Sequence, residues 1–123
     1  MASQEPTPAP ADDTERAAPG CRSVAHDLSE DAVAADVDVL AALGNDTRYE
    51  ALRLIADADD AVCVCELEPA LGVSQGAVSQ ALSRLFSAGL VDRRKDGRWR
   101  YYTATPRAER LLDVLDETRD VDE

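Results

Sequence analysis

Residues 71–85 read LGVSQGAVSQALSRL, and this stretch decides the fold. Gly72, Val73 and Ser74 are typical of a tight turn, and serine is a preferred residue at the N-terminus of a helix. The apolar residues that follow recur at i, i+3, i+4 and i+7, the spacing of one helix face. They are Val78, Ala81, Leu82 and Leu85. The pattern predicts a helix that begins after Ser74 and is closed by Gly89.

Three further helices are expected before this turn. Ser29 is suited to cap the first, which ends at Gly44, and Asn45 or Asp46 opens the second. A β-prone run at 61–65 precedes a third, short helix that ends near residue 71. The apolar face of the first helix consists of Val33, Val37, Leu40 and Ala41, and that of the second consists of Ala51, Leu52, Leu54 and Ile55. A short helix, a turn with glycine and a longer helix together predict a helix-turn-helix.

A β-hairpin is expected next, because 90–95 and 98–103 are strand-like and Asp96-Gly97 between them is a strong hairpin signal. Pro106 then starts a last helix in the manner of a first-turn proline. The apolar face of that helix consists of Ala108, Leu111, Leu112 and Leu115. With 123 residues the chain builds one small core, of a kind often completed by dimerisation. The predicted fold class is mainly α with a small β-hairpin, a dimeric winged helix-turn-helix.

This arrangement predicts contact with DNA, since the second helix of such a pair enters the major groove with its N-terminal end. Arg84 is suited to a phosphate, and strand periodicity places Arg98 and Arg100 on one face of the hairpin, with Trp99 and Tyr101 packed on the core from the other. The candidate base-reading residues are Ser74, Gln75, Gly76, Ser79 and Gln80. The alternative is a well-capped surface helix beside a solvated basic hairpin.

The net charge of −12 is unusual for a DNA-binding protein, since affinity for DNA comes largely from neutralised phosphates. The positive charge is clustered, however: residues 84–100 hold six basic residues and two acidic ones. Aspartate is abundant and Lys95 is the only lysine, a surface that resembles those of proteins from salt-accumulating halophiles. In molar salt the Debye length falls to about 3 Å, which screens acidic self-repulsion.

Cys63 and Cys65 form a candidate ion site, because thiolates are soft ligands that select soft ions. On a regular helix, positions i and i+2 lie about 200° apart, so the pair can share one ion only where the segment is extended or unwound. Pro69 disfavours helical geometry at Glu68 and removes a backbone bond to Cys65, so we expect a first turn that is irregular or easily distorted. The alternative is that both cysteines are small buried hydrophobic residues.

Between Leu43 and Thr105 the chain resembles the ArsR/SmtB family of metal-responsive repressors. The matching pieces are LGNDTR at 43–48, CVCEL at 63–67, LGVSQGAVS at 71–79, and AGLV at 88–91 before the wing at 98–102. The resemblance implies a homodimer formed by the first and last helices, operator DNA as partner, and arsenite or antimonite as inducer at Cys63 and Cys65. Two positions depart from the family pattern: Ala81 replaces a histidine common in the recognition helix, and Glu68 stands where some arsenic sensors have a third cysteine.

The expected function is therefore a repressor that leaves DNA when an ion reshapes the start of the third helix. Trivalent arsenic favours three thiolates, and the third is predicted to be Cys21 or, alternatively, a small-molecule thiol or water. Other open alternatives are a trigger by redox state or by cadmium or zinc, and an acidic protein-interaction module that does not meet DNA.

Residues 1–28 are expected to be a disordered acidic arm, 29–117 the DNA-binding and dimerisation domain, and 118–123 an acidic tail. The N-terminus lacks a signal-peptide pattern and no apolar run reaches the length of a membrane span, so we expect a cytoplasmic protein. Three cysteines in such a chain argue against a disulfide framework. No catalytic constellation and no obligatory cofactor are expected.

Overall fold

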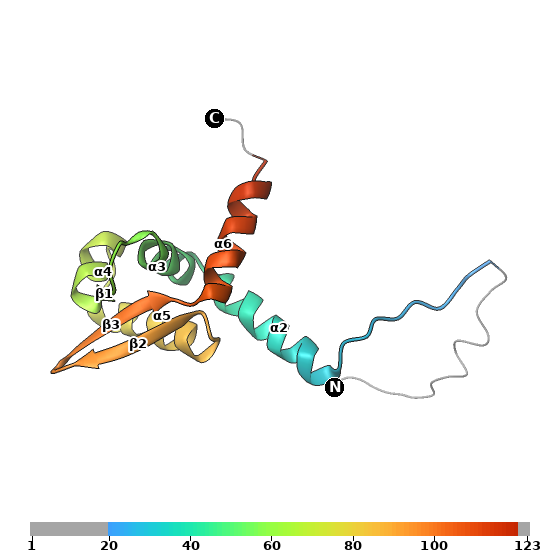
Figure 1. Ribbon diagram of the computed structural model, residues 1–123, viewed down its shortest axis with the longest axis horizontal. Helices are drawn as coiled ribbons and strands as arrows, with labels where there is room; N and C mark the ends of the chain where they lie inside the picture. Colours follow the sequence, from blue (N-terminus) through green and yellow to red (C-terminus); the bar gives the residue numbers. More distant parts are fainter. Residues whose placement is uncertain (1–19, 121–123) are drawn as a thin grey trace.

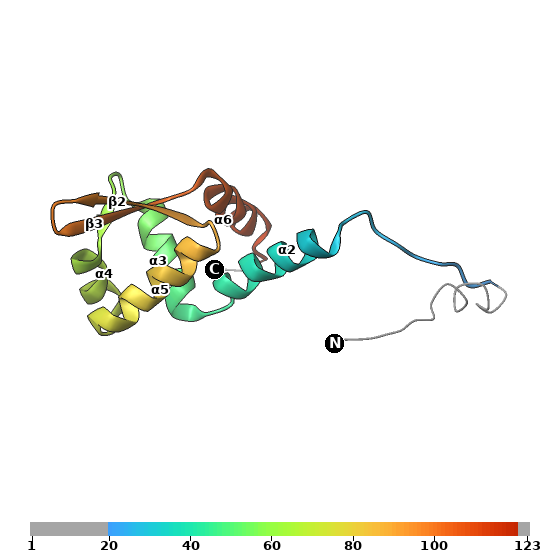
Figure 2. The same cartoon turned by 90° about the horizontal axis from the view of Figure 1, so that it is seen from below.

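The computed structural model describes residues 20–120. In chain order its elements are α2 (Glu30–Leu43), α3 (Asp46–Asp57), β1 (Val62–Cys63), α4 (Val64–Leu71), α5 (Gln75–Ser87), β2 (Val91–Asp96), β3 (Trp99–Ala104) and α6 (Pro106–Thr118). Helices α3, α4 and α5 lie against one side of the sheet (Figure 2), and α2 and α6 lie at the end away from the hairpin tip (Figure 1). Helices α4 and α5 are the helix-turn-helix and β2 and β3 are the wing, as predicted.

The helices begin at the residues that the sequence indicates. The side chains of Ser29, Asn45 and Ser74 each accept a hydrogen bond from a backbone N–H in the first turn of the helix they precede, at 3.0 to 3.1 Å. Pro106 occupies the first turn of α6 behind a threonine cap. Gly72 ends α4 in the left-handed region at φ 70°, which favours glycine and lets the chain turn directly into α5.

The wing differs from its predicted register by one residue. Asp96 pairs with Trp99, so the two loop residues are Gly97 and Arg98 instead of Asp96 and Gly97. Gly97 has a φ of 66°, and the glycine therefore stands at the first loop position, where a two-residue hairpin needs a positive φ. Arg98 consequently lies at the tip of the wing and not in a strand.

A third strand joins the wing, which the sequence did not predict as a partner. Strand β1 pairs antiparallel with β3, in the order β1-β3-β2, with Val62 opposite Tyr102 and Cys63 opposite Tyr101. The β-prone run at 61–65 was recognisable, but its pairing joins residues that are far apart in the sequence, at 62–63 and 101–102. This pairing attaches the cysteine segment to the wing.

The core lies between α3, α5 and the sheet, and includes the predicted face of α5. Its fully buried larger side chains are Leu52, Leu67, Leu82, Leu85, Leu90, Val78 and Val91. On α2 the residues that pack on the core are Val39 and Ala42, while the predicted stripe of Val33, Val37 and Leu40 is exposed. The stripe on α2 therefore faces away from the domain that it belongs to.

Residues 21–29 precede α2 as exposed chain without helix or strand. The rest of the predicted arm, 1–19, and the end of the predicted tail, 121–123, lie outside the described residues, so the domain boundaries stay predictions. Among residues 20–120, no helix is long and apolar enough to cross a membrane.

Candidate DNA interface and thiol site

Helix α5 has two sharply different faces. Gln75, Gly76, Ser79 and Gln80 are exposed along its first two turns, while the opposite face is buried in the core. Ser74 is also exposed, but its hydroxyl is used as the helix cap, where it accepts from the N–H of Ala77. The exposed face therefore carries two amides and one hydroxyl that are free to meet a ligand at the N-terminal end of the helix.

Arg84, predicted to contact a phosphate, is held within the domain. Its Nη2 lies 3.1 Å from the carboxylate of Asp38 on α2 and donates to the backbone oxygen of Asp38 at 3.4 Å. This contact ties α5 to α2 and competes with the predicted role, which stays a prediction.

The wing arginines are exposed, but the aromatic residues beside them do not pack as expected. Trp99 is 50% exposed and Tyr101 is only partly buried, whereas Tyr102 is 4% exposed and joins the core. Tyr102 and Arg100 lie on the same face of β3, because they are two residues apart in a strand. That face is exposed near the tip of the hairpin and buried in the core near its base. The prediction that Trp99 and Tyr101 pack on the core was wrong because the outer part of the hairpin extends beyond the helices.

The two cysteines of the CVC segment lie on either side of a strand-to-helix junction. Cys63 ends β1 and is buried, and Cys65 lies in the first turn of α4 and is exposed. Their sulfur atoms are 2.9 Å apart, longer than the roughly 2.05 Å of a disulfide, so both are free thiols. On a regular helix these two side chains would point about 200° apart. Because the backbone of Cys63 is extended, the two side chains point toward each other instead.

The start of α4 is an ordered turn and does not have the irregular geometry predicted from Pro69, while an easily distorted turn stays a prediction. The sulfur of Cys63 accepts from the N–H of Cys65 at 3.4 Å, and the carboxylate of Glu66 accepts from the N–H of Cys63 at 2.8 Å. The helix runs through Pro69 without interruption. These two reciprocal hydrogen bonds hold the first turn of α4 in place, although Pro69 has no N–H to donate to that turn. The thiol of Cys63 is therefore part of the helix cap.

The thiol pair fits two of the three ligands that the predicted ion prefers. Sulfurs on a common ion with bonds of about 2.3 Å lie roughly 3.3 to 3.8 Å apart, so binding would separate this pair by less than 1 Å. The hydrogen bond between the thiols raises the pKa of Cys65.

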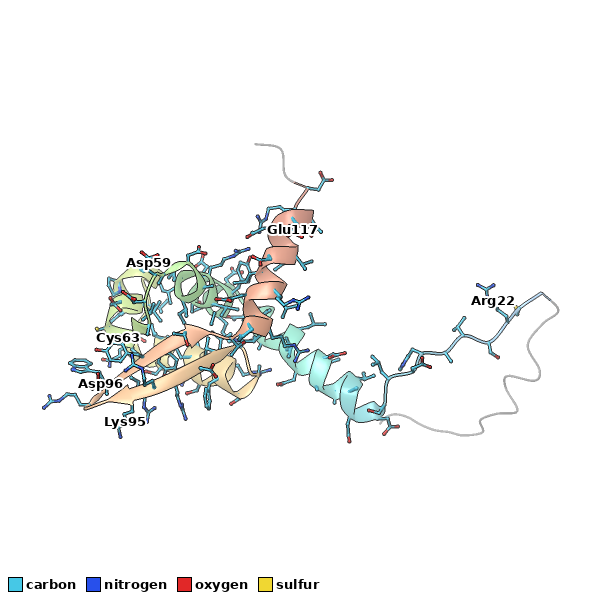
Figure 3. The ribbon with its side chains drawn as sticks, in the orientation of Figure 1. Arg22, Asp59, Cys63, Lys95, Asp96 and Glu117 are labelled. Atoms are coloured by element: carbon cyan, nitrogen blue, oxygen red, sulfur yellow. The ribbon has the colours of Figure 1, made fainter. Side chains whose placement is uncertain are left out.

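No third ligand is brought to this pair within the described chain. Residues 20–120 contain no group of three or more His, Cys, Asp or Glu side chains placed to hold a metal. Cys21 is exposed, and its neighbour Arg22 lies at the opposite end of the molecule from Cys63 (Figure 3). A third ligand from Cys21 would therefore have to come from a partner chain or from a different arm position.

A cleft joins the thiol pair to the predicted DNA surface, a connection that sequence reasoning missed. It has a volume of about 610 Å³ between the start of α4, the start of α5 and the outer wing, and its lining includes Cys63, Cys65, Gln75, Lys95, Trp99 and Arg100. Figure 3 places Cys63 at the same end of the molecule as Lys95 and Asp96 of the hairpin. The cleft could not be predicted because the pairing of β1 with β3, which brings the cysteines next to the wing, was not predicted.

Together these features define the class: a winged helix-turn-helix protein with an exposed reading helix and a basic wing. The chain belongs to the family described as "Bacterial regulatory protein, arsR family", whose model matches residues 45–93. It is 58% identical over 111 residues to a Halobacterium salinarum protein named "Putative arsenical resistance operon repressor ArsR2", covering 90% of this chain and 93% of that one. A second protein of that organism, named "Putative arsenical resistance operon repressor ArsR", is 51% identical over 72% of this chain and 68% of its own length.

Solved structures agree with this assignment. HlyU from Vibrio cholerae matches with a TM-score of 0.64 and 30% identity over 74% of this chain and 98% of its own. A Mycobacterium bovis domain described as a homodimeric winged helix-turn-helix DNA-binding domain matches with a TM-score of 0.66 and 28% identity, over 76% and 88% of the two chains. The chain is thus a DNA-binding transcriptional regulator and not an enzyme, and its relatives are consistent with a halophile source.

Proposed function

We propose that this protein is a repressor that binds operator DNA as a dimer and releases it when arsenite or antimonite binds Cys63 and Cys65. The observation that carries the proposal is the pair of free thiols 2.9 Å apart at the start of α4. That position is adjacent to both DNA-contacting elements. The names of the Halobacterium relatives support an arsenical as the inducer.

Operator binding rests on the exposed face of α5 and on the wing. Gln75, Ser79 and Gln80 meet base edges in the major groove, with Gln suited to adenine, while Gly76 lets the helix backbone approach. Arg98 and Arg100 of the wing contact phosphates of the DNA backbone. Acidic repulsion is screened in concentrated salt, so binding is expected to persist there although the net charge is −12.

Dimerisation uses the apolar residues that the isolated chain leaves exposed on α2 and α6. Val37 and Leu40 are 56% and 65% exposed, and Val114 and Leu115 are 53% and 43% exposed. These helices lie at the end of the domain away from the wing tip (Figure 1), which leaves both reading heads of a dimer free. Exposed apolar side chains on two helices at the same end of a domain are typical of an interface.

The switch acts through the helix cap that Cys63 provides. When an ion draws the two sulfurs apart, the hydrogen bond from the N–H of Cys65 to the sulfur of Cys63 is lost, and the first turn of α4 must adjust. Helix α4 leads into α5 through the Gly72 turn, and β1 is paired with the wing. The structural change therefore reaches both α5 and the wing. By reciprocity, bound DNA must lower the affinity for the ion by the same factor by which the ion lowers the affinity for DNA.

A gel shift with the protein and its own promoter region in molar KCl tests the proposal. We expect a shifted band that arsenite or antimonite abolishes at concentrations where cadmium and zinc have little effect. No shift at any salt concentration would contradict the repressor, and release by cadmium or zinc alone would contradict the assigned inducer.

A redox trigger is the second candidate, favoured by the same 2.9 Å contact between the two thiols. An oxidant would join the sulfurs with loss of two protons and two electrons and so remove the Cys63 cap. In the gel shift, release by hydrogen peroxide that dithiothreitol reverses, without any effect of arsenite, would favour this candidate.

A further inference from the structure

The cleft beside the thiol pair carries concentrated positive charge in an acidic protein. Lys95, Arg98 and Arg100 contribute to its lining, and no Asp or Glu of the described residues does. Glu66 and Asp96, the two acidic residues closest to the lining residues along the chain, do not line the cleft: Glu66 caps the N–H of Cys63, and Asp96 lies 3.8 Å from Arg94. The cleft is therefore built to receive a negatively charged group next to the sulfurs.

The cleft is also much larger than an ion. An arsenic atom with one bound oxygen occupies a few tens of Å³, comparable with the roughly 30 Å³ that one water molecule takes up in the liquid. The cleft of about 610 Å³ falls in the size range of sites for small molecules, about 300 to 1,000 Å³. The two thiols would fill two positions of a three-coordinate ion, and both cysteines line this cleft.

We propose that the third ligand is an anionic low-molecular-weight thiol, whose carboxylates pair with Lys95, Arg98 and Arg100 across the cleft. This inference rests on the proposed function and specifies the form of its inducer. Each of the three thiols replaces one hydroxide of arsenous acid, and each hydroxide leaves with the thiol proton as water. No oxidant or reductant takes part.

The geometry joins recognition of the thiol to release of DNA. The three cations lie in the outer wing, and two of them, Arg98 and Arg100, are the residues that the proposed DNA interface uses for phosphates. Carboxylates bound in the cleft would neutralise the same charges that hold the operator. An anionic thiol should therefore make arsenite a stronger inducer than a neutral thiol does.

Arsenite binding to the full-length Cys21→Ser protein tests this without DNA, because that variant leaves only the thiol pair. Arsenite is premixed with mercaptosuccinate, 2-mercaptoethanol or cysteamine, which are anionic, neutral and cationic thiols. We expect mercaptosuccinate to give roughly tenfold tighter binding than mercaptoethanol in 0.1 M KCl, from three exposed ion pairs, and cysteamine to give the weakest. Native mass spectrometry should show protein, arsenic and one mercaptosuccinate in a single complex.

Charge-removing variants supply the control. Lys95→Gln and Arg100→Gln should each reduce the preference for mercaptosuccinate, and molar KCl should reduce it in all proteins. Arg93→Gln is the matched control, because Arg93 stacks on Phe86 with its guanidinium carbon 4.0 Å from the ring centroid and does not line the cleft. It should keep the full preference.

The possible failures are distinguishable. If arsenite does not bind the wild type with any thiol, the proposed function itself fails. If arsenite binds equally with all three thiols, the anionic ligand is wrong while the thiol site stands. X-ray absorption that shows three sulfur neighbours in the wild type without added thiol, and two in Cys21→Ser, would assign the third position to Cys21 and overturn this inference.

Discussion

Gly76 lies on the exposed face of α5, in a place where the protein itself does not require glycine. A Cβ built there would meet nothing nearer than the hydroxyl of Ser74 at 3.9 Å, and the residue has no positive φ. Glycine inside a helix costs about 0.5 to 1 kcal/mol relative to alanine. We propose that glycine is present because DNA approaches the helix closely at this turn.

We predict that Gly76→Ala separates folding from DNA binding. The variant should melt at a higher temperature than the wild type, because alanine favours the helix, and should bind operator DNA more weakly, because the methyl group faces the groove. Thermal denaturation and fluorescence anisotropy measure the two effects. A variant that binds DNA with unchanged affinity would show that the backbone at residue 76 does not approach the duplex.

Single residues were predictable where their role is local. The caps at Ser29, Asn45 and Ser74 follow from the chemistry of helix termini, which concerns only neighbouring backbone groups. The partnership of Arg84 with Asp38 was not predictable, because it joins residues 46 positions apart on helices whose packing the sequence does not specify.

At the scale of elements, we expect the wing to make the DNA contacts that do not depend on base sequence. Arg98→Ala and Arg100→Ala should weaken binding to all duplexes about equally, and each should lower the slope of log affinity against log salt by about 0.9 if it removes one phosphate contact. Gln75→Ala should instead relax sequence preference at one position. Anisotropy titrations with operator and scrambled duplexes at several KCl concentrations distinguish them. A change in preference without a change in overall affinity for Arg98→Ala would contradict the assignment of the wing.

Helices α3 and α6 are joined by an ion pair that should make stability depend on pH. The Nη1 and Nη2 atoms of Arg53 donate to the carboxylate of Asp116, at 3.1 and 2.6 Å, and these bonds hold the pKa of Asp116 below its usual value near 3.8. A depressed carboxyl pKa stabilises the fold above the unfolded value, and that stabilisation is lost as the pH falls through the folded value.

We therefore expect Asp116→Asn to melt below the wild type at pH 7, with a difference that shrinks as the pH is lowered through 4 toward 2 and as KCl is added. Arg94 offers the control, since its contact with Asp96 is longer, at 3.8 Å, and highly exposed. Asp96→Asn should leave the melting temperature nearly unchanged. A difference for Asp116→Asn that grows at low pH would contradict the role of this pair.

Elements were predictable where a periodic pattern extends over several turns, as in α5, whose predicted face of Val78, Ala81, Leu82 and Leu85 is buried throughout. Strand β1 has two residues and no periodicity to detect, so its pairing with β3 could not be inferred. The cleft that connects the thiol pair with the wing depends on that pairing, and it was missed for the same reason.

At the scale of the whole molecule, the exposed apolar residues of α2 and α6 predict a dimer. Leu115→Asp should yield monomers that bind DNA weakly, since a two-fold partner is needed to contact two half-sites about one helical turn apart. Leu112, on the same predicted stripe, is 2% exposed and belongs to the core, so an acid there would unfold the domain instead of testing the interface. Light scattering and a mobility shift provide the two readouts.

The matched control is Leu54→Asp on α3, because Leu54 is 37% exposed and lies outside the proposed interface. It should remain a dimer. An unchanged dimer for a folded Leu115→Asp protein would contradict the assigned interface.

The most direct test of the switch is release of operator DNA by arsenite in the wild type and in Cys65→Ser, followed by anisotropy in molar KCl. A hydroxyl replaces the exposed thiol with little change in size, so the variant should fold and bind DNA as the wild type does, while a hard ligand holds a soft ion poorly. We predict that arsenite lowers the affinity of the wild type for DNA by roughly 5- to 150-fold, a typical coupling, and leaves Cys65→Ser bound. Full release of Cys65→Ser by arsenite would contradict it.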